Sequence, residues 1–300
     1  ENLRYGENPH QLGAFYSQNK KNKLEQIHGK TLSYNNYNDI LAAITISKSL
    51  PKNIGTVIVK HGNPCGVSAL KNNLDSYKSA LETDPISAFG GIVSCNYKVT
   101  QKLAFMLNKI FLEVVVANGF DKKALKILKL KKNLRLIDSS KISFSEVWKF
   151  NSLDNFTLMQ SEDKKIFSKK DFRIVSKKQP SKSQLDNLMF AFNVCRYTKS
   201  NAIVLASNKS TIGIGSGQPS RLDSCEIAIN KMNKFSKIKN EIVAASDAFF
   251  PFVDGIEKLV QSGASAIAQP AGSIRDKEII KFANETNTVL VFSKTRHFRH

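Results

Sequence analysis

Short apolar runs alternate with segments whose apolar residues recur at helical spacing, and this series occurs twice along the chain. Strands that alternate with helices are typical of an α/β architecture. The predicted strands are Thr56–Val59, Gly91–Cys95, Glu113–Ala117 and Asn133–Ile137 in the first series, and Ala202–Ala206, Ile242–Ala245, Ala266–Ala268 and Val289–Phe292 in the second.

The segments around these strands predict helices. They are Leu74–Glu82, Thr100–Lys109 and Lys122–Lys129, then Gln184–Cys195, Arg221–Met232, Gly255–Ser262 and Lys277–Glu285. Because the series occurs twice, we expect two similar α/β halves, residues 1–138 with a Lys-His motif and residues 183–300, although no residue-level repeat relates them. Residues 139–182 are more polar and only weakly periodic, so we expect them to be a connector.

The composition narrows the class of protein. Hydrophobic residues make up 41% of the 300 residues, as in globular proteins. No stretch approaches the roughly 20 apolar residues that span a bilayer, and the amino end lacks a signal-peptide pattern. We therefore expect a cytoplasmic protein without membrane contact. The sequence starts with Glu1 rather than Met, which leaves room for an upstream segment.

The net charge of +20 allows two interpretations. Lysine-rich runs at Asp121–Arg135, Lys164–Lys178 and Lys231–Lys239 could neutralise nucleic-acid phosphates, or they could form a solvated surface that attracts small anions. We favour the second interpretation and expect no nucleic-acid partner. The reason is that the excess is lysine rather than arginine, and that no nucleic-acid-binding motif accompanies it.

The cysteines are four in number and widely spaced: Cys65, Cys95, Cys195 and Cys225. Without a C-x-x-C pair they predict neither a structural zinc site nor a disulfide scaffold. They fit reduced thiols in the cytosol.

Unusual residues gather where the predicted strands end, which is where open α/β sheets bind ligands. The block Val59–Gly66 (VKHGNPCG) places Lys60 beside His61, a cation beside a proton acceptor, in a stretch that Gly62, Pro64 and Gly66 are expected to bend. A solvated turn would explain this block equally well. The block Asp84–Gly91 (DPISAFGG) sets an aromatic residue beside two glycines just before a strand.

The second series carries similar blocks. Ile212–Arg221 (IGIGSGQPSR) is rich in glycine and opens a helix, so its backbone N–H groups could hold an anion, although its spacing is not the dinucleotide fingerprint. Ser246–Asp254 (SDAFFPFVD) carries three phenylalanines between two carboxylates. Core packing explains one or two of them, and binding of a flat ligand would explain more. Both chain ends carry arginines that suit phosphate.

Together these blocks resemble aminoimidazole carboxamide ribonucleotide (AICAR) transformylase, the formyltransferase portion of the bifunctional purine biosynthesis protein. The resemblance runs from one end of the chain to the other, with several long blocks in the same order. The blocks are LRYGENPHQ at Leu3–Gln11, VKHGNPCG at Val59–Gly66, DPISAFGG at Asp84–Gly91, KSNAIV at Lys199–Val204, IGIGSGQPSR at Ile212–Arg221, SDAFFPFVDGIE at Ser246–Glu257, QPAGSIRD at Gln269–Asp276 and TRHFRH at Thr295–His300.

The resemblance implies transfer of a formyl group from 10-formyltetrahydrofolate to the 5-amino group of AICAR, giving formyl-AICAR and tetrahydrofolate in purine biosynthesis. It implies two halves that resemble cytidine deaminase, a homodimer with active sites shared across the interface, and a site for a monovalent cation such as potassium, whose carbonyl cage the sequence does not show. Zinc is not expected. Zinc deaminases need H-x-E and P-C-x-x-C motifs, and neither His61 nor Cys65 belongs to one.

The resemblance assigns the catalytic roles to Lys60, His61 and Asn201. The substrate amine is a poor nucleophile because it is conjugated with the imidazole carboxamide. A base such as His61 would remove its proton as it attacks the formyl carbon. Lys60 would stabilise the developing oxyanion, an effect worth about 3–4 kcal/mol for one lost donor. Asn201 would orient the formyl oxygen or the amine.

The binding residues are assigned in the same way. Those for the nucleotide are Arg4, Tyr5 and Arg296 at the phosphate and Asn36, Glu113 and Phe249 at the base and the ribose or carboxamide. Those for the folate are Phe89, Gly90, Arg221, Pro251 and Asp254. The neighbouring Asn35 is an alternative to Asn36, and the match at Glu113 rests on the short block Glu113–Phe120. Asp254 would meet the pterin amino group, or else it would only cap the helix that follows.

Two other classes of function remain open. A metal-free, deaminase-like hydrolase acting on a nucleotide would share the fold and the phosphate site but would not need folate. An RNA-binding protein would show an RNA affinity that falls steeply with salt and would turn over no small molecule. Many members of the family carry an amino-terminal cyclohydrolase domain that this sequence lacks, so we do not expect this chain alone to close the purine ring.

Overall fold

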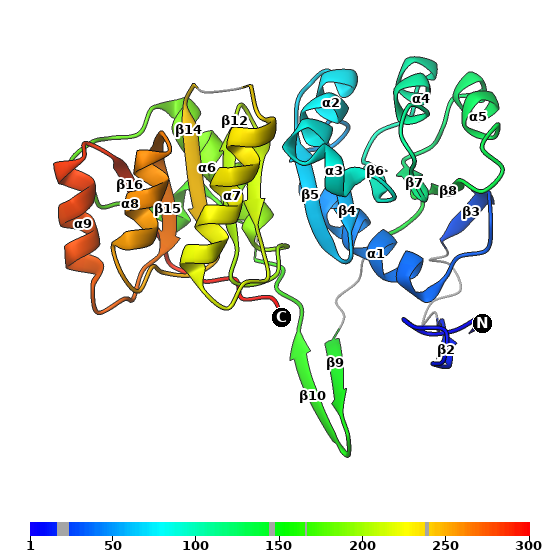
Figure 1. The fold of residues 1–300 in the computed structure, drawn as a ribbon, viewed down its shortest axis with the longest axis horizontal. Helices are drawn as coiled ribbons and strands as arrows, with labels where there is room; N and C mark the ends of the chain where they lie inside the picture. Colours follow the sequence, from blue (N-terminus) through cyan, green and yellow to red (C-terminus); the bar gives the residue numbers. More distant parts are fainter. Residues whose placement is uncertain (17–23, 144–147, 166, 238–239) are drawn as a thin grey trace.

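The computed structural model describes residues 1–16, 24–143, 148–165, 167–237 and 240–300. Twelve strands form one mixed sheet with helices packed against it (Figure 1), in the order β11-β16-β15-β14-β12-β13-β5-β4-β6-β7-β8-β3. The predicted α/β architecture is therefore confirmed. Positions 144–147, in the expected connector, and positions 166, 238 and 239, in two of the lysine-rich runs, lie outside the described residues.

The first half of the sheet is built by elements that follow a short amino-terminal ribbon of β1 (Asn2–Leu3) and β2 (Gly13–Ala14). Its predicted strands and helices agree with the structure to within two residues. The elements are β3 (Glu25–His28), α1 (Tyr34–Ser49), β4 (Thr56–Lys60), β5 (Asn63–Ser68), α2 (Asn73–Thr83), α3 (Pro85–Ala88), β6 (Ile92–Cys95), α4 (Gln101–Leu107), β7 (Val114–Ala117), α5 (Lys122–Leu128) and β8 (Arg135–Asp138).

The second half repeats this order of elements without a counterpart of the short α3. Its elements are β11 (Phe172–Ile174), α6 (Lys182–Cys195), β12 (Ile203–Ser207), β13 (Ser210–Gly215), α7 (Arg221–Phe235), β14 (Ile242–Ser246), α8 (Asp254–Gln261), β15 (Ala264–Pro270), α9 (Asp276–Glu285) and β16 (Val289–Ser293). The strand order β5-β4-β6-β7-β8-β3 is matched by β13-β12-β14-β15-β16-β11, with the same parallel and antiparallel pairings. The two halves thus share one topology.

The halves join where β5 lies antiparallel to β13, with Ser68 opposite Ser210. The two serine hydroxyls are 2.8 Å apart, and the hydroxyl of Thr83 in α2 donates to the carbonyl of Thr211 at 2.7 Å. Both contacts are buried. The sheet is therefore continuous across the two halves.

Three apolar clusters make the core. One cluster combines α1 and α6 with strands of both halves, whereas the second lies under α2, α4 and α5, and the third under α7, α8 and α9. This gives a three-layer arrangement in which α1 and α6 cover one face of the sheet. Among the described residues, no helix has the length and apolarity to cross a bilayer.

Several elements were not predicted, among them α1, β3, β5 and β13, and for the residues of β5 and β13 the structure corrects the expectations. Pro64 and Gly66, expected in a bend, lie in β5. Gly213 and Gly215, expected in an anion-binding loop, lie in β13 beneath α7, where a Cβ on Gly215 would be 1.9 Å from the carbonyl oxygen of Ser224. These glycines let a helix approach the sheet closely.

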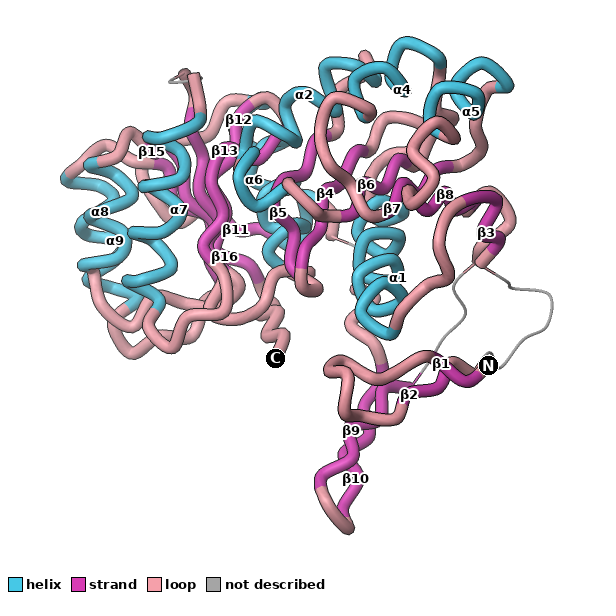
Figure 2. The backbone as a smooth tube through the Cα atoms, turned by 45° about the vertical axis from the view of Figure 1, so that its right-hand side comes forward, coloured by secondary structure: helices cyan, strands magenta, loops and turns pink. Residues whose placement is uncertain are grey.

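The expected connector is more structured than its weak periodicity indicated. It contains a hairpin of β9 (Trp148–Leu153) and β10 (Phe156–Ser161), a 3₁₀ turn at Lys169–Asp171, and the strand β11, which pairs with β16. Figures 1 and 2 both show the hairpin projecting away from the body of the molecule. Its large apolar side chains Trp148, Phe150, Phe156, Leu158 and Met159 are each more than half exposed.

Candidate functional site

The antiparallel junction of β5 and β13 brings predicted site residues of both halves to one edge of the sheet. The carboxyl end of β4 and the amino ends of β6 and β7 lie at this edge, together with the amino end of β12 and the carboxyl ends of β13, β14 and β16. It is the lower edge in Figure 1, where the carboxyl terminus is labelled.

The predicted site residues form two groups, one from each half. The Lys-His group consists of Arg4, Tyr5, Asn36, Lys60, His61, Phe89, Gly90 and Glu113. The cavity group consists of Asn201, Arg221, Phe249, Pro251, Asp254 and Arg296.

The turn between β4 and β5 carries the Lys-His pair. Lys60 ends β4 and its Nζ donates to the carbonyl of Phe89 at 2.8 Å, beside Gly90. His61 and Gly62 have φ angles of 52° and 71°, and Asp39 of α1 accepts hydrogen bonds from both of their backbone N–H groups, at 3.2 and 2.6 Å. Asp39 thus holds the turn, while the exposed side chain of His61 is available to a ligand.

Burial and hydrogen bonding shift the pKa of Asp39 in opposite directions. Desolvation raises the pKa of its carboxyl group above the ordinary value, although the backbone N–H groups of Gly62 and His61 pull in the opposite direction. The two donors fix the carboxylate below the turn. Asp39 was not predicted from the sequence, in which it is only one of several polar residues in the first part of α1.

The first turn of α1 settles which asparagine faces Glu113. Asn36 is buried, accepts from the backbone N–H of Ser33 at 3.2 Å and donates to a carboxylate oxygen of Glu113 at 2.8 Å. Asn35 is exposed and donates to the carbonyl of Glu7 at 3.1 Å instead. Asn36 and Glu113 are therefore brought together, whereas Asn35 fastens the amino-terminal segment to α1.

Arg4 and Tyr5 lie in that amino-terminal segment and contact each other. Arg4 donates to the hydroxyl of Tyr5 at 2.8 Å, and its guanidinium lies 4.6 Å from the centre of the Tyr5 ring. The stack of Phe15 on Tyr37, with ring centres 4.0 Å apart, adds to the contact of the segment with α1. An exposed arginine beside a tyrosine hydroxyl suits an anionic group.

A cavity of about 420 Å³ lies at the edge of the second half and is lined by all six residues of the cavity group. Its volume and its mixture of apolar and polar lining are typical of small-molecule sites. No residue of the Lys-His group lines it. The structure therefore gathers the cavity group around one cavity, whereas the residues of the Lys-His group lie outside it and form separate contact pairs.

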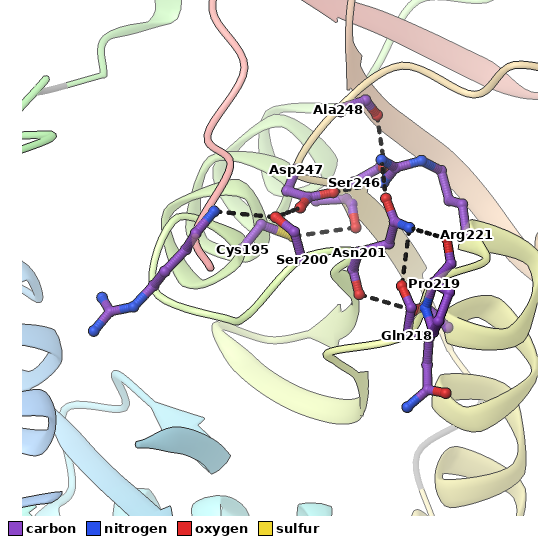
Figure 3. Close-up of polar contacts among 12 residues, drawn as sticks. Cys195, Ser200, Asn201, Gln218, Pro219, Arg221, Ser246, Asp247 and Ala248 are labelled. Carbon is purple, nitrogen blue, oxygen red and sulfur yellow. Dashed lines mark hydrogen bonds and ion pairs between the residues drawn. The ribbon is translucent and has the colours of Figure 1, made fainter. Parts of the chain in front are cut away.

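The wall of the cavity contains a network of buried polar groups around Arg221 (Figure 3). Arg221 donates to Asp247 at 2.5 Å, to the hydroxyl of Ser246 at 2.7 Å and to the side-chain oxygen of Asn201 at 2.7 Å. The side chain of Asp247 is fully buried and also accepts from the hydroxyl of Ser200 at 2.5 Å. A charge buried this deeply needs such partners, so the network fixes the guanidinium rigidly.

The amide of Asn201 is almost fully used. Both of its N–H groups donate to backbone carbonyls, of Gln218 at 2.9 Å and Pro219 at 2.8 Å, while its oxygen accepts from Arg221. The peptide bond between Ser200 and Asn201 is cis. Because only one lone pair on the oxygen is left, this side chain can accept one further hydrogen bond but cannot donate one.

Two exposed phenylalanines form the mouth of the cavity. Phe252 and Phe298 both line it, and each carries an arginine over its ring, Arg275 at 4.9 Å and Arg296 at 4.6 Å. Phe250 also lines the cavity, but its side chain is buried in the core. All three phenylalanines after β14 thus line the cavity, and Phe298 is a lining residue that was not predicted.

Asp254 does not have the capping role considered for it. The cap position of α8 is Val253, and Asp254 is the first helical residue, with an oxygen that accepts from the N–H of Gly255 at 2.7 Å. A carboxylate in the first turn still favours the helix electrostatically. Asp254 is exposed at the cavity, as a ligand-binding residue would be.

The cysteines are unpaired and buried. Burial raises the pKa of Cys65 to about 12, so its thiol stays protonated and unreactive at neutral pH. Across the described ranges, no group of three or more His, Cys, Asp or Glu side chains is arranged to hold a metal ion.

The fold and this edge define an α/β protein with two topologically matched halves and a ligand-binding cavity at the ends of its strands. Residues 1–231 match the family model of the AICARFT/IMPCHase bienzyme. The chain is 45% identical over 302 residues to the bifunctional purine biosynthesis protein PurH of Leptospira biflexa and 42% identical over 308 residues to that of Acetivibrio thermocellus. It is 41% identical over 304 residues to the protein of the same name from Aquifex aeolicus.

This chain belongs to the AICARFT/IMPCHase bienzyme family, as its sequence blocks predicted. In each of the three comparisons the whole of this chain is aligned, but it spans only 59% of the relative's length. The chain therefore matches one part of proteins that are named for two activities.

Proposed function

We propose that this chain transfers a formyl group from 10-formyltetrahydrofolate to the 5-amino group of AICAR, giving formyl-AICAR and tetrahydrofolate. The observation that carries the proposal is the pairing of two features at one sheet edge. One is a base beside a cation in the turn at Lys60 and His61, and the other is a cavity with exposed aromatic rings and fixed arginines. Family membership supports the same reaction, and no cyclohydrolase activity is proposed for these residues.

In the proposed reaction, His61 takes the proton of the AICAR amine as the nitrogen attacks the formyl carbon. The bond between the formyl carbon and N10 of the folate breaks, and N10 takes up a proton, which balances the transfer. Lys60 stabilises the negative charge that develops on the formyl oxygen. Asn201 can only accept at its free lone pair, so it orients the amine rather than the formyl oxygen.

The binding roles follow the two groups. Arg4, Tyr5 and Arg296 would hold the phosphate, and Asn36, Glu113 and Phe249 the base and the ribose or carboxamide. Phe89, Gly90, Arg221, Pro251 and Asp254 would contact the folate. The contact of Asn36 with Glu113 and the exposure of Asp254 at the cavity support these assignments.

We further propose that the two halves are cytidine-deaminase-like domains without zinc, residues 1–138 and 183–300, joined by residues 139–182. The shared strand order supports the duplication. The cysteines are too far apart in sequence to form the P-C-x-x-C motif of zinc deaminases. A monovalent cation such as potassium and a cytoplasmic location complete the proposal, with no ligands assigned to the cation.

The enzyme is proposed to act as a homodimer in which each site is shared. Two observations support this. The cavity is lined by one predicted group only, so a second copy of the chain could supply the Lys-His group. The projecting hairpin exposes large apolar side chains on both of its faces, and exposed apolar surface of this kind marks sites of protein association.

The proposal is tested by incubating the protein with AICAR and 10-formyltetrahydrofolate and measuring tetrahydrofolate and formyl-AICAR. We expect both products in equal amounts, and none when either substrate is omitted. His61→Ala should abolish transfer while AICAR binding, measured by calorimetry, stays within about twofold, because a general base contributes roughly 100-fold or more to the rate and little to binding. Normal turnover in His61→Ala would remove this residue from the mechanism, and AICAR turnover without folate would indicate a hydrolase.

A further inference from the structure

The carboxyl-terminal segment after β16 carries two cavity-lining residues on either side of a buried one. Arg296 and Phe298 are exposed and line the cavity, whereas His297 between them is buried. The segment has no regular secondary structure, so individual contacts must hold it. Its backbone is bonded to the network of the cavity wall, because the N–H of His297 donates to the carbonyl of Asp247 at 2.9 Å and the carbonyl of Arg299 accepts from Ser200 at 2.8 Å.

The side chain of His297 points away from the cavity and pairs with a residue from another part of the chain. Its Nδ1 contacts the carboxylate of Asp163, and its ring packs edge-on against Phe167 and Phe192, with centres 4.7 and 5.4 Å apart. Partial burial raises the pKa of Asp163, but the hydrogen bond and charge of His297 outweigh it and leave this pKa below its ordinary value. Nε2 of His297 is buried and has no hydrogen-bond partner in the described part of the chain.

Asp163 belongs to the chain that leaves the projecting hairpin, two residues after the end of β10. Arg196, at the end of α6, clamps the same stretch, because it donates to the carbonyl of Lys165 and its guanidinium lies 5.4 Å from the ring centre of Phe167. The base of the hairpin is therefore fastened to α6 and, through Asp163, to the carboxyl-terminal segment. One side-chain pair connects the hairpin with a wall of the cavity.

We propose that His297 and Asp163 are positioning residues: the contact between the buried imidazole and the partly exposed carboxylate sets the place of Arg296, and so the recognition of a phosphate group on the substrate. This inference rests on the proposed function, in which Arg296 binds the nucleotide phosphate. Neither side chain touches the cavity, so the effect passes through the backbone of residues 296–298. Without the pair, the segment keeps its backbone bonds but loses the anchor that turns Arg296 toward the cavity.

The test compares AICAR with its nucleoside, which lacks the phosphate, as formyl acceptors. Asp163→Asn should lower the preference in kcat/KM for the nucleotide over the nucleoside at least about tenfold, since misplacement by about 1 Å can cost ~100-fold. The change should lie in KM for AICAR, with kcat at saturation retained within about twofold. Asp186→Asn is the matched control, because Asp186 lies on α6 and pairs with Lys169 at 3.4 Å, outside the cavity.

A double variant separates positioning from general damage. If the pair acts only through Arg296, Arg296→Ala should lose the same preference, and adding Asp163→Asn to it should cost nothing more. His297→Asn, whose amide can replace Nδ1 as the donor, should keep most of the preference, whereas His297→Leu should lose it. These two also replace Asp163→Asn if that variant does not fold, as judged by thermal unfolding.

An unchanged preference in a folded Asp163→Asn enzyme overturns the inference, as do additive losses in the double variant. Absence of formyl transfer in the wild-type protein is a different result, because it removes the proposed function itself. Retention of formyl transfer with loss of phosphate preference in His297→Leu but not in His297→Asn supports the pair.

Discussion

At the scale of single residues, Asp254 distinguishes most clearly between a binding role and a structural role. Asp254→Asn should raise KM for 10-formyltetrahydrofolate about tenfold and leave KM for AICAR within about twofold. A carboxylate accepts paired, charge-assisted hydrogen bonds from the amino-pyrimidinone edge of a pterin, and an amide accepts them less well. Steady-state kinetics with each substrate varied in turn measure both values.

The control for Asp254 is Glu257→Gln. Glu257 also lies in the first turn of α8 and loses the same charge, but it does not line the cavity. Both variants remove a carboxylate that favours the helix amino end, so their thermal stabilities should change alike. If Asp254→Asn leaves folate kinetics as they are in Glu257→Gln, Asp254 has no part in folate binding.

The sequence blocks predicted which residues line the cavity but not the hydrogen bonds between them. Asn201 was predicted as a catalytic residue and Arg221 as a folate-binding residue, because each stands in a characteristic block. In the structure much of their hydrogen-bonding capacity is taken by each other, by Asp247 and by backbone carbonyls. These bonds depend on where three loops meet in space, and neither periodicity nor spacing contains that information. Asp39 was missed for the same reason, since its partners are backbone groups of a distant turn.

At the scale of elements, the strand β13 depends on the absence of a side chain at Gly215. Gly215→Ala should lower the free energy of unfolding by about 2–3 kcal/mol or more, because the new Cβ would meet backbone atoms of Ser224 in α7 that cannot move alone. Urea unfolding followed by circular dichroism measures the change.

Gly217→Ala is the comparison for this substitution. No atom lies within 4 Å of a Cβ at Gly217, so only its left-handed φ of 68° is strained, at a cost of about 1–2 kcal/mol. Equal losses in the two alanine variants would mean that α7 does not pack against Gly215 as closely as described.

The sequence predicts best the elements whose burial gives them a largely apolar composition. Strands such as β7 and β14 are buried on both faces and therefore read as short apolar runs. The strands β5 and β13 pass close beneath α2 and α7, so their glycines looked like turns. The strand β11 has only three residues at the edge of the sheet, and the exposed hairpin of β9 and β10 buries too little to show a pattern.

At the scale of the whole molecule, the hairpin is the feature that a single copy of the chain leaves unexplained. An isolated two-stranded hairpin is marginally stable in water, and this one exposes Phe150 and Met159 as a cross-strand pair. Phe150→Ser with Met159→Ser should weaken dimerisation at least about tenfold, since exposed apolar pairs of this kind often carry much of an interface's binding energy. Sedimentation velocity over a range of concentrations measures the shift.

Phe105→Ser is the control for the hairpin variant. Phe105 is a similarly exposed aromatic residue, on α4 rather than on the hairpin. Its loss should leave the dimer unchanged. If the double hairpin variant dimerises as tightly as Phe105→Ser, the interface lies elsewhere on the molecule.

We proposed that one formyl-transfer site combines the Lys-His group of one copy with the cavity group of another. Complementation between two variant proteins tests this most directly. His61→Ala and Asn201→Ala proteins, each lacking a residue placed in catalysis and expected to be inactive alone, are mixed, dissociated and reassociated, and tetrahydrofolate release is assayed. In a symmetric dimer, about half of the particles are then mixed and each has one intact site, so about a quarter of wild-type activity should return. A mixture of His61→Ala with Lys60→Ala, both from one group, should stay inactive. Activity in the first mixture no higher than in its separate components, with the wild type active and dimeric, would contradict the account.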